Sequence, residues 1–230
     1  MNVAVILAGG KGLRLGNQVP KQMLMLGSKP VISWSVDTFH KISLIDKMII
    51  VSEKNLINDM KNLFPVMHYP KIFSFVEGGI ERSDSSYNAL ISSEFDANDI
   101  FLFHDAARPF ISEDIITGLI EKVKISGACG TYVKSTDTIA IVDDSIIVSI
   151  PERKKVYSAQ TPQGFRYDLI KKAHQYQKEV KSITITDDVS LVANMGYDVS
   201  VIEGSYNNIK ITSELDFRFA QFLISGGDKC

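Results

Sequence analysis

Short runs of apolar and β-branched residues alternate with amphipathic stretches along the first part of the chain. Each run has the length of a strand that is buried on both faces, which is typical of a parallel sheet covered by helices. The sequence therefore predicts an α/β protein, a three-layer α/β/α sandwich with a mostly parallel, Rossmann-like sheet. The expected strands are Val3–Leu7, Lys47–Val51, Ile72–Val76, Ile100–Phe103 and Ala128–Val133, and the expected helices are Pro30–Phe39, Asn55–Leu63, Ser83–Ile91 and Glu113–Lys124.

Two short apolar runs around Asp143-Asp144 interrupt this alternation between Thr138 and Ile150. Such a pair, joined by turn residues, is typical of a β-hairpin. The hairpin either folds over its own sheet or reaches a second subunit, and we favour the second subunit for this arm, at about 137–158. The chain then returns through Gln160–Gly164 to helices at Arg166–Gln177 and Asp187–Met195, a strand at Asp198–Ile202 and a helix at Ser213–Leu223 with Asp216 in its cap.

Composition narrows the class of protein. The 230 residues contain no Pro/Ser-rich linker or low-complexity tract, so we expect one domain. A formal net charge of −2 gives no general attraction to nucleic acid or to an anionic membrane. No apolar stretch approaches the roughly 20 residues that span a bilayer, and we expect a cytoplasmic protein. The two cysteines, Cys129 and Cys230, do not predict a disulfide framework.

A glycine-rich loop with three cations follows the first expected strand. It reads Leu7-Ala8-Gly9-Gly10-Lys11-Gly12-Leu13-Arg14-Leu15-Gly16-Asn17-Gln18-Val19-Pro20-Lys21. Glycine lets backbone N–H groups approach phosphate oxygens, and the cations neutralise phosphate charge. The spacing fits neither the dinucleotide fingerprint Gly-x-Gly-x-x-Gly nor a P-loop. The loop therefore predicts a nucleotide site, and a simple strand-to-helix turn is the alternative.

Two further polar segments follow expected strands, Glu77-Gly78-Gly79-Ile80-Glu81-Arg82-Ser83-Asp84-Ser85 and His104-Asp105-Ala106-Ala107-Arg108-Pro109. Because parallel strands end at one edge of a sheet, we expect both segments to meet the glycine loop in one crevice. Ser85 and the glycines can surround a flat base, unless Ser83 or Ser85 caps a helix. Asp105 can hold a ribose hydroxyl or, through water, Mg²⁺, and Arg108 can bind a substrate phosphate. The alternative is an Asp105–Arg108 ion pair that caps the next helix, and His104 is expected to be a satisfied, partly buried histidine.

The chemistry must proceed without an activated nucleophile, because the four histidines are scattered and neither cysteine has a histidine nearby. Nucleotidyl transfer to a phosphate monoester fits, since the attacking oxygen is already anionic near neutral pH. Arg14 and Lys21 are the candidates to stabilise charge on the α-phosphate. Lys11 can contact the outer phosphates or water. Lys210 stands among residues suited to a buried strand, so its cation needs a partner or an anionic ligand.

Together these segments resemble the 2-C-methyl-D-erythritol 4-phosphate cytidylyltransferases of the non-mevalonate isoprenoid pathway, and the resemblance runs nearly end to end. The matching strings are Leu7-Ala8-Gly9-Gly10-Lys11-Gly12-Leu13-Arg14, Pro20-Lys21-Gln22, Gly78-Gly79-Ile80-Glu81-Arg82-Ser83-Asp84-Ser85, His104-Asp105-Ala106-Ala107-Arg108-Pro109, Asp137-Thr138, Ala159-Gln160-Thr161-Pro162-Gln163, Thr186-Asp187-Asp188 and Asn208-Ile209-Lys210-Ile211-Thr212. Together they are highly specific for this superfamily, although each string alone would be modest evidence.

The resemblance implies a homodimer with exchanged arms, CTP with Mg²⁺, and release of pyrophosphate. The catalytic residues that it implies are Arg14, Lys21, Arg153 and Lys210, of which Arg14 and Lys21 would stabilise the pentacoordinate α-phosphate. The residues implied for CTP are Ala8, Gly9, Gly10, Lys11, Gly12, Gly79, Glu81, Ser85, Asp105 and Ala106. The acceptor phosphate would be held by Asp105, Arg108, Thr161 and Lys210, with the partner's Thr138 and the partner's Arg153. Mg²⁺ would bind mainly through CTP phosphates, with Asp105 as a candidate ligand.

The acceptor is the open point of this interpretation. Ile150-Pro151-Glu152-Arg153 with Tyr157 looks like the ribitol-5-phosphate cytidylyltransferases, which make CDP-ribitol for wall or capsule polymers. Ala106-Ala107 and the stretch from Thr186 through Ser205 look like the isoprenoid branch, and we expect methylerythritol phosphate. A regulatory protein that binds CTP without turnover is disfavoured, because every family cation is retained. A nicotinamide-dependent reductase is disfavoured by the glycine spacing.

Overall fold

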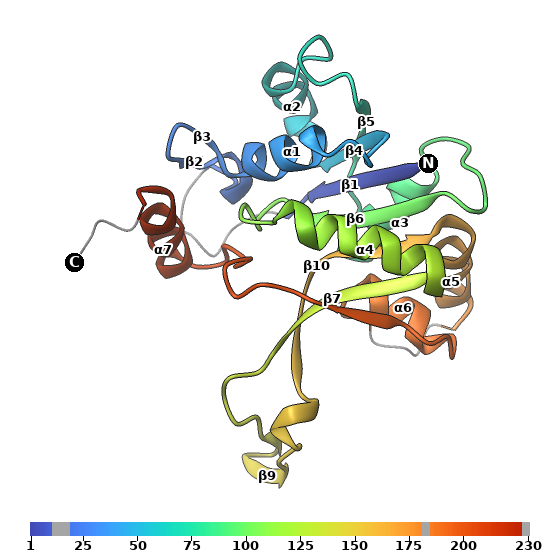
Figure 1. The fold of residues 1–230 in the computed structure, drawn as a ribbon, viewed down its shortest axis with the longest axis vertical. Helices are drawn as coiled ribbons and strands as arrows, with labels where there is room; N and C mark the ends of the chain where they lie inside the picture. Colours follow the sequence, from blue (N-terminus) through green and yellow to red (C-terminus); the bar gives the residue numbers. More distant parts are fainter. Residues whose placement is uncertain (11–18, 181–184, 227–230) are drawn as a thin grey trace.

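The computed structural model describes all residues except 11–18, 181–184 and 227–230. Within the described residues, one seven-stranded sheet has the order β11-β7-β10-β6-β1-β4-β5 (Figure 1). The strands are β1 Asn2–Ala8, β4 Lys47–Ser52, β5 Ile72–Glu77, β6 Ile100–Asp105, β7 Ala128–Lys134, β10 Tyr157–Arg166 and β11 Ser200–Glu203. Only β10 runs antiparallel to its neighbours β6 and β7, so the mostly parallel sheet is confirmed.

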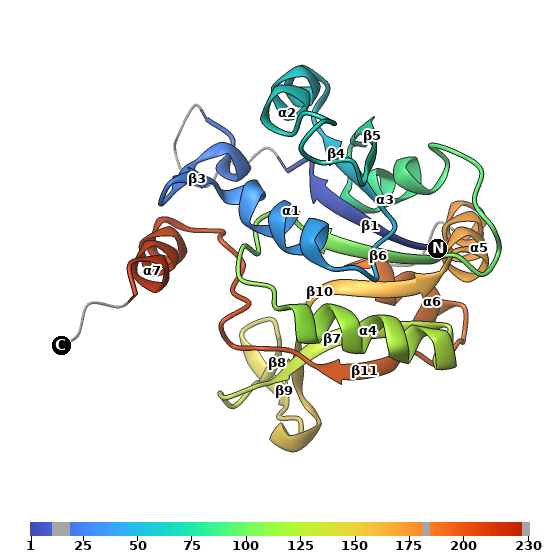
Figure 2. The ribbon, with the colours of Figure 1, turned by 45° about the horizontal axis from the view of Figure 1, so that its top comes forward.

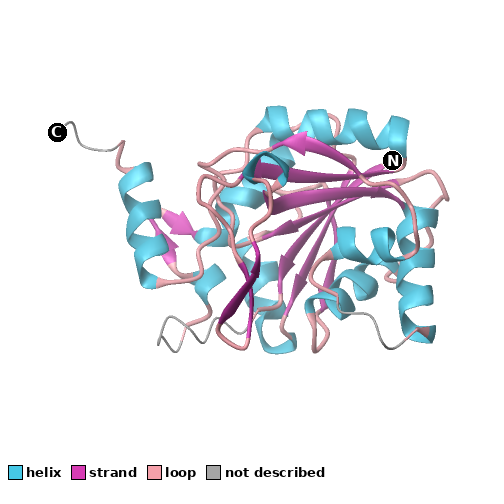
Figure 3. Ribbon diagram, turned by 90° about the horizontal axis from the view of Figure 1, so that it is seen from below, coloured by secondary structure: helices cyan, strands magenta, loops and turns pink. Residues whose placement is uncertain are grey.

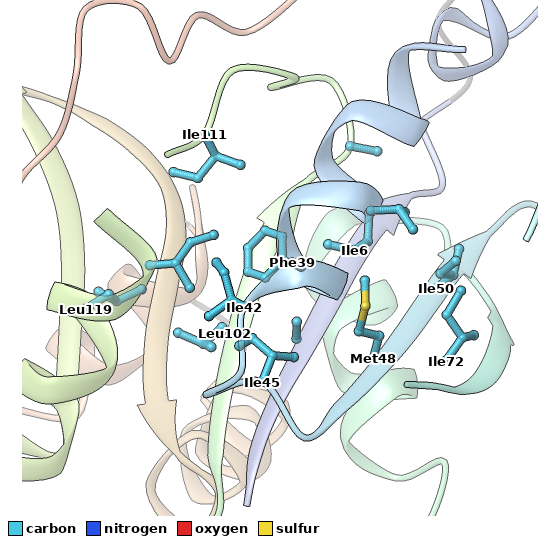
Figure 4. Packing of buried hydrophobic residues seen from close by; sticks show 14 of the residues in the cluster. Ile6, Phe39, Ile42, Ile45, Met48, Ile50, Ile72, Leu102, Ile111 and Leu119 are labelled. Atoms are coloured by element: carbon cyan, nitrogen blue, oxygen red, sulfur yellow. The ribbon is translucent and has the colours of Figure 1, made fainter. Parts of the chain in front are cut away.

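Helices cover both faces of the sheet, as Figures 2 and 3 show. One face packs against α1 Val31–Lys41, α2 Ile57–Leu63 and α4 Glu113–Ser126, and the other against α3 Arg82–Leu90, α5 Tyr167–Glu179 and α6 Asp188–Asn194. Successive side chains of a strand point to opposite faces. In β1, Ala4 and Ile6 join the first core, which is drawn in Figure 4, and Val3 and Val5 join the second. The part of a strand that lies between two helical layers is therefore apolar on both faces, as Val3–Leu7 of β1 are.

The boundaries agree closely with those expected, since the five strands of the first part all form, each extended by one or two residues. Pro30 is the N-cap of α1 rather than its first residue. The Ser213–Asp216 capping box at the start of α7, Glu214–Ile224, is confirmed. Strand β10, where only a return segment is expected, is not predicted from the sequence, and neither is the two-stranded sheet of β2, Met25–Leu26, and β3, Lys29–Pro30. The described residues also include the 3₁₀ turns η2 Lys21–Met23, η3 Lys54–Leu56 and η4 Arg153–Lys155.

The predicted hairpin forms an arm that projects from the body of the molecule (Figure 1). Strands β8, Ile141–Asp143, and β9, Ile146–Ser149, pair antiparallel. The turn residues Asp144 and Ser145 have φ values of 43° and 66°, a left-handed geometry that suits a tight hairpin turn. Its apolar side chains are 52% to 70% exposed: Ile141, Val142, Ile146, Ile147, Val148 and Ile150. The hairpin therefore does not bury its apolar residues against its own sheet.

In the part of the chain that the structure describes, no helix combines the length and the apolarity needed to cross a bilayer. Cys129 is a buried free thiol in β7, and burial raises its pKa to about 11. Cys230 lies outside the described residues. Cys129 therefore behaves as a small apolar residue of the core.

We expect a side chain at Gly164 of β10 to destabilise the protein. A Cβ there would stand 2.7 Å from Val123 Cγ2, 3.2 Å from Leu119 Cγ and 3.3 Å from Leu102 Cδ2. Gly164→Ala should lower the free energy of unfolding by about 1–3 kcal/mol through overpacking. The control is Gly118→Ala on the exposed face of α4, where a Cβ meets nothing within 4 Å and the change should stabilise by about 0.4–1 kcal/mol. Urea unfolding measures the free energy of unfolding of both variants. Equal changes in Gly164→Ala and Gly118→Ala would contradict this packing.

Candidate functional site

Four neighbouring strands, β1, β4, β5 and β6, end at one cavity of about 980 Å³. Its volume lies at the upper end of the range for small-molecule sites, roughly 300–1,000 Å³. The lining residues are Leu7, Ala8, Gly9, Gly10, Lys21, Gln22, Glu53, Lys54, Asn55, Glu77, Gly78, Gly79, Ile80, Glu81, Arg82, Ser85, Asp105, Ala106, Ala107 and Lys210. The three polar segments that the sequence analysis singled out therefore do converge on one crevice.

The glycine loop enters this cavity from the end of β1. Lys11, Gly12 and Arg14, which the sequence analysis assigned to CTP and to catalysis, lie outside the described residues. At the far end of the loop, Lys21 lines the cavity, and the buried Gln22 donates from Nε2 to Ala8 O at 2.7 Å. This hydrogen bond ties the two ends of the loop together. Gln22 was not predicted as a site residue, although it stands in the Pro-Lys-Gln string of the resemblance.

The second glycine segment is folded tightly against the start of α3. The Ser85 hydroxyl accepts a hydrogen bond from Gly79 N–H at 3.0 Å and donates one to Glu81 O at 3.3 Å. A Cβ on Gly79 would stand 2.1 Å from Asp84 Cβ, so only glycine fits. Glu81 and Asp84 form the capping box of α3, and neither Ser83 nor Ser85 is the cap. The alternative of a capping serine is therefore wrong, and Ser85 shapes the loop that faces the cavity.

Asp105 is the centre of a cluster of charges at the end of β6. Its carboxylate lies 2.7 Å from Lys210 Nζ, 3.3 Å from Arg82 Nε and 3.9 Å from Arg108 Nε. Burial opposes ionisation, but the nearby cations Arg82, Lys210 and Arg108 outweigh it and hold the pKa of Asp105 well below its usual range. Asp105 therefore stays ionised, and the partner expected for Lys210 is confirmed.

Arg108 and His104 hold the backbone around this cluster. The buried guanidinium of Arg108 donates from Nη1 to Asn208 O at 2.7 Å and from Nη2 to Ala159 O at 3.3 Å. The Asp105–Arg108 ion pair of the alternative interpretation is present, but it does not cap α4, whose N-cap is Ser112. His104 is fully buried between Arg108 O and the Thr161 hydroxyl, and burial lowers its pKa to about 4. The expectation of a satisfied histidine is confirmed, although His104 is fully rather than partly buried.

Arg82 extends the cluster into the protein and was missed as a site residue. Its Nη1 lies 2.6 Å from Oδ2 of the fully buried Asp188 in α6. Burial opposes its charge, but Asp188 and Asp105 together raise the pKa of Arg82. The three cations Arg82, Arg108 and Lys210 thus face two carboxylates, which leaves one positive charge in excess. Both Arg82 and Asp188 stand in strings of the resemblance, but their pairing cannot be read from sequence.

The segment around Lys210 is not the strand that its apolar neighbours suggested, and it has neither helical nor strand structure. Asn208 N–H donates to Ser205 O and Ile211 N–H to Ala107 O, so these groups are not available to a sheet ladder. Ile209 and Ile211 instead pack with α7 in a third, smaller core. The Lys210 side chain is 38% exposed and reaches the cavity.

Two predicted substrate residues lie apart from this cavity. Thr138 and Arg153 are exposed on the arm, and neither lines the cavity of its own chain. Thr161, by contrast, is buried beside Asp105, whose backbone N–H donates to its hydroxyl at 3.0 Å. The structure therefore brings together Asp105, Arg108, Thr161 and Lys210, and leaves the arm residues outside.

The described residues do not form a protein site for a metal ion. They contain no group of three or more His, Cys, Asp or Glu side chains placed to hold one. The candidate ligand Asp105 has Lys210 on one carboxylate oxygen and Arg82 on the other. Its oxygens are thus engaged by cations, and Asp105 does not fit as a direct ligand of Mg²⁺.

Comparison with known proteins identifies relatives over the whole chain. The family model for IspD, 2-C-methyl-D-erythritol 4-phosphate cytidylyltransferase, matches residues 2–226. The protein of that name from Alkaliphilus oremlandii is 39% identical over 222 residues, which cover 96% of this chain and 93% of the relative. The one from Clostridium perfringens is 40% identical over 223 residues, which cover 96% and 98%.

Comparison with solved structures points to the same family. The 4-diphosphocytidyl-2C-methyl-D-erythritol synthase of Anaerococcus prevotii superposes with a TM-score of 0.85 at 30% identity, covering 97% of this chain and 96% of that one. The 2-C-methyl-D-erythritol 4-phosphate cytidylyltransferase of Francisella tularensis gives 0.81 at 30% identity, with 96% and 98% covered. The chain therefore belongs to the IspD family of 2-C-methyl-D-erythritol 4-phosphate cytidylyltransferases.

Proposed function

We propose that this chain transfers the cytidylyl group of CTP to 2-C-methyl-D-erythritol 4-phosphate and releases pyrophosphate. The observation that carries the proposal is the cavity at the strand ends, where a glycine loop and the cations around Asp105 face the same space. The relatives compared above are named for methylerythritol phosphate, which favours that acceptor over ribitol 5-phosphate. They are also named as transferases, which disfavours a purely regulatory CTP-binding protein.

The reaction needs charge and position rather than a base. An anionic oxygen of the acceptor phosphate forms a bond to the α-phosphorus of CTP, the bond from that phosphorus to the bridging oxygen breaks, and pyrophosphate leaves. Arg14 and Lys21 stabilise the charge that grows on the α-phosphoryl oxygens. Lys210 and the partner's Arg153 orient the acceptor phosphate, and Arg108, which follows β6, and Thr161 of β10 support it. In-line placement of two anions is the main contribution of the protein.

CTP lies along the cavity from the glycine loop to α3. The backbone of Ala8, Gly9 and Gly10 faces its phosphates, and Lys11 and Gly12 are further residues that bind CTP. The loop of Gly79, Glu81 and Ser85 surrounds cytosine, and Asp105 with Ala106 faces the ribose. Mg²⁺ enters with the triphosphate as part of the substrate, because the hard oxygens of the triphosphate suit this ion.

The active unit is a dimer with exchanged arms. An isolated two-stranded hairpin is marginally stable in water, and contiguous exposed apolar side chains mark interaction surfaces. The exposed apolar residues of β8 and β9 fit a second copy of the chain, which brings the partner's Thr138 and the partner's Arg153 to the cavity. We place this single nucleotidyltransferase domain, with its arm at about 137–158, in the cytoplasm, where CTP is made.

The acceptor is tested by measuring pyrophosphate release with CTP and Mg²⁺. We expect turnover with 2-C-methyl-D-erythritol 4-phosphate to exceed turnover with ribitol 5-phosphate by at least about 10²-fold, because polar groups aimed at one alditol are left unpaired by another. Equal rates would remove the assignment of the acceptor. Absence of release with both phosphates would remove the proposed transfer itself.

The roles of Arg14 and Lys21 are tested by the kinetics of their alanine variants. Arg14→Ala and Lys21→Ala should each lower kcat about 10²–10³-fold and leave the dissociation constant of CTP nearly unchanged, because both act on charge that grows in the transition state. Lys124→Ala is the control, since this lysine is paired with Glu121 on the surface of α4. If the two variants bind CTP more weakly but keep the wild-type kcat, the assignment is contradicted.

Arm exchange is tested in mixed dimers. Arg153→Ala and Lys21→Ala chains, each inactive alone, should regain about a quarter of wild-type activity when refolded together, because half the dimers are mixed and each has one complete site. A mixture of Lys21→Ala with Arg14→Ala chains is the control and should stay inactive, since both changes fall in the same loop. No restored activity in the first mixture would place Arg153 in its own chain's site.

A further inference from the structure

The segment that brings Lys210 to the cavity has no regular structure of its own. Residues 204–212 connect β11 to α7 without helix or strand. Its backbone N–H groups make only local or isolated hydrogen bonds, such as Gly204 to Tyr132 O at 2.7 Å and Ile211 to Ala107 O at 2.9 Å. Irregular segments are more mobile than helices and strands unless other groups restrain them. A cation at a defined place on such a segment therefore needs side chains that hold the backbone.

Asn208 supplies one such restraint. Its side chain is fully buried, and Nδ2 donates to Thr161 O at 2.9 Å and to Gln160 Oε1 at 3.3 Å. Its backbone oxygen accepts from Arg108 Nη1 at 2.7 Å. Oδ1 of Asn208 is buried and has no partner among the residues that the structure describes, which costs stability. A buried amide that is only partly satisfied is expected at a functional site rather than in an ordinary core.

Gln160 restrains the same segment from β10. Its Nε2 donates to Ser205 O at 2.8 Å, and its Oε1 accepts from Ser205 N–H at 3.3 Å as well as from Asn208. The backbone at Gly204 lies so close that a Cβ there would stand 2.4 Å from Gln160 Oε1. We call the paired amides of Gln160 and Asn208 the amide clamp. It joins the segment to the strand that also carries Thr161.

The amide clamp ends two residues before Lys210, whose ammonium lies 2.7 Å from the Asp105 carboxylate. We propose that Asn208 is a positioning residue, which acts with Gln160 to set the Lys210 ammonium at the cavity for transfer of the cytidylyl group. This inference rests on the proposed function, because it concerns the place of a cation that orients the acceptor phosphate. Displacement of such a group by about 1 Å can lower turnover about 10²-fold.

A double-mutant cycle tests the clamp with Asn208→Ala, Lys210→Ala and the double variant. Asn208→Ala should lower kcat about 10²-fold while the dissociation constant of CTP changes less than about twofold. In the Lys210→Ala background the same change should alter kcat by less than about twofold, because its effect passes through Lys210. The proposal would be overturned if the kcat losses of the two single variants multiply in the double variant. It would also be overturned if kcat is unchanged in Asn208→Ala.

Asn207→Ala is the matched control, because this neighbouring asparagine is exposed and takes no part in the clamp. It should keep kcat within about twofold of the wild-type value. If Asn208→Ala fails to fold, Gln160→Ala removes the clamp from the β10 side and enters the same cycle.

Hydrogen exchange separates the clamp from the proposed function. Amides of residues 205–211 should exchange faster in Asn208→Ala and not in Asn207→Ala, whether or not the protein transfers cytidylyl groups. Unchanged exchange would overturn the clamp itself. A third result is also distinct. If Asn208→Ala exchanges faster but the wild-type protein is inactive with every acceptor, the proposed function is removed, and with it the catalytic purpose of the clamp.

Discussion

The site depends on one carboxylate that stays ionised while it is nearly buried. Asp105 can do so because Arg82, Arg108 and Lys210 surround it, and these cations come from α3, from the loop after β6 and from the segment after β11. Buried ion pairs contribute little net stability, because the loss of hydration offsets much of their attraction. The cluster is therefore better explained by function than by stability. It assembles only when the sheet has brought three distant parts of the chain together.

The cations gathered around Asp105 match the chemistry of two phosphates. The substrates repel each other, and a site that neutralises both can bring an anionic oxygen to a phosphorus without a base or a covalent intermediate. The fold supplies the place, since parallel strands between two helical layers leave polar loops at their carboxyl ends. Gln22, Ser85 and Asn208 then hold these loops by hydrogen bonds between side chain and backbone.

The sequence predicts those parts of the structure whose cause is local. Strand segments buried on both faces are apolar, as in Val3–Ala8 of β1, and these strands were recognised with nearly correct ends. Strand β10 was missed because Gln160, Pro162 and Gly164 are typical of a loop, and its ladder is indeed irregular between Gln160 and Gly164. The pairing of Arg82 with Asp188 and the amide clamp could not be predicted, because their members are far apart in sequence and meet only in the folded chain.

The most direct test is a crystal structure with an unreactive CTP analogue and 2-C-methyl-D-erythritol 4-phosphate. We expect the acceptor phosphate to lie against the Lys210 ammonium, opposite the bridging oxygen of the α-phosphorus, with Lys21 beside that phosphorus. An acceptor phosphate bound elsewhere, with Lys210 still directed only at Asp105, would contradict it.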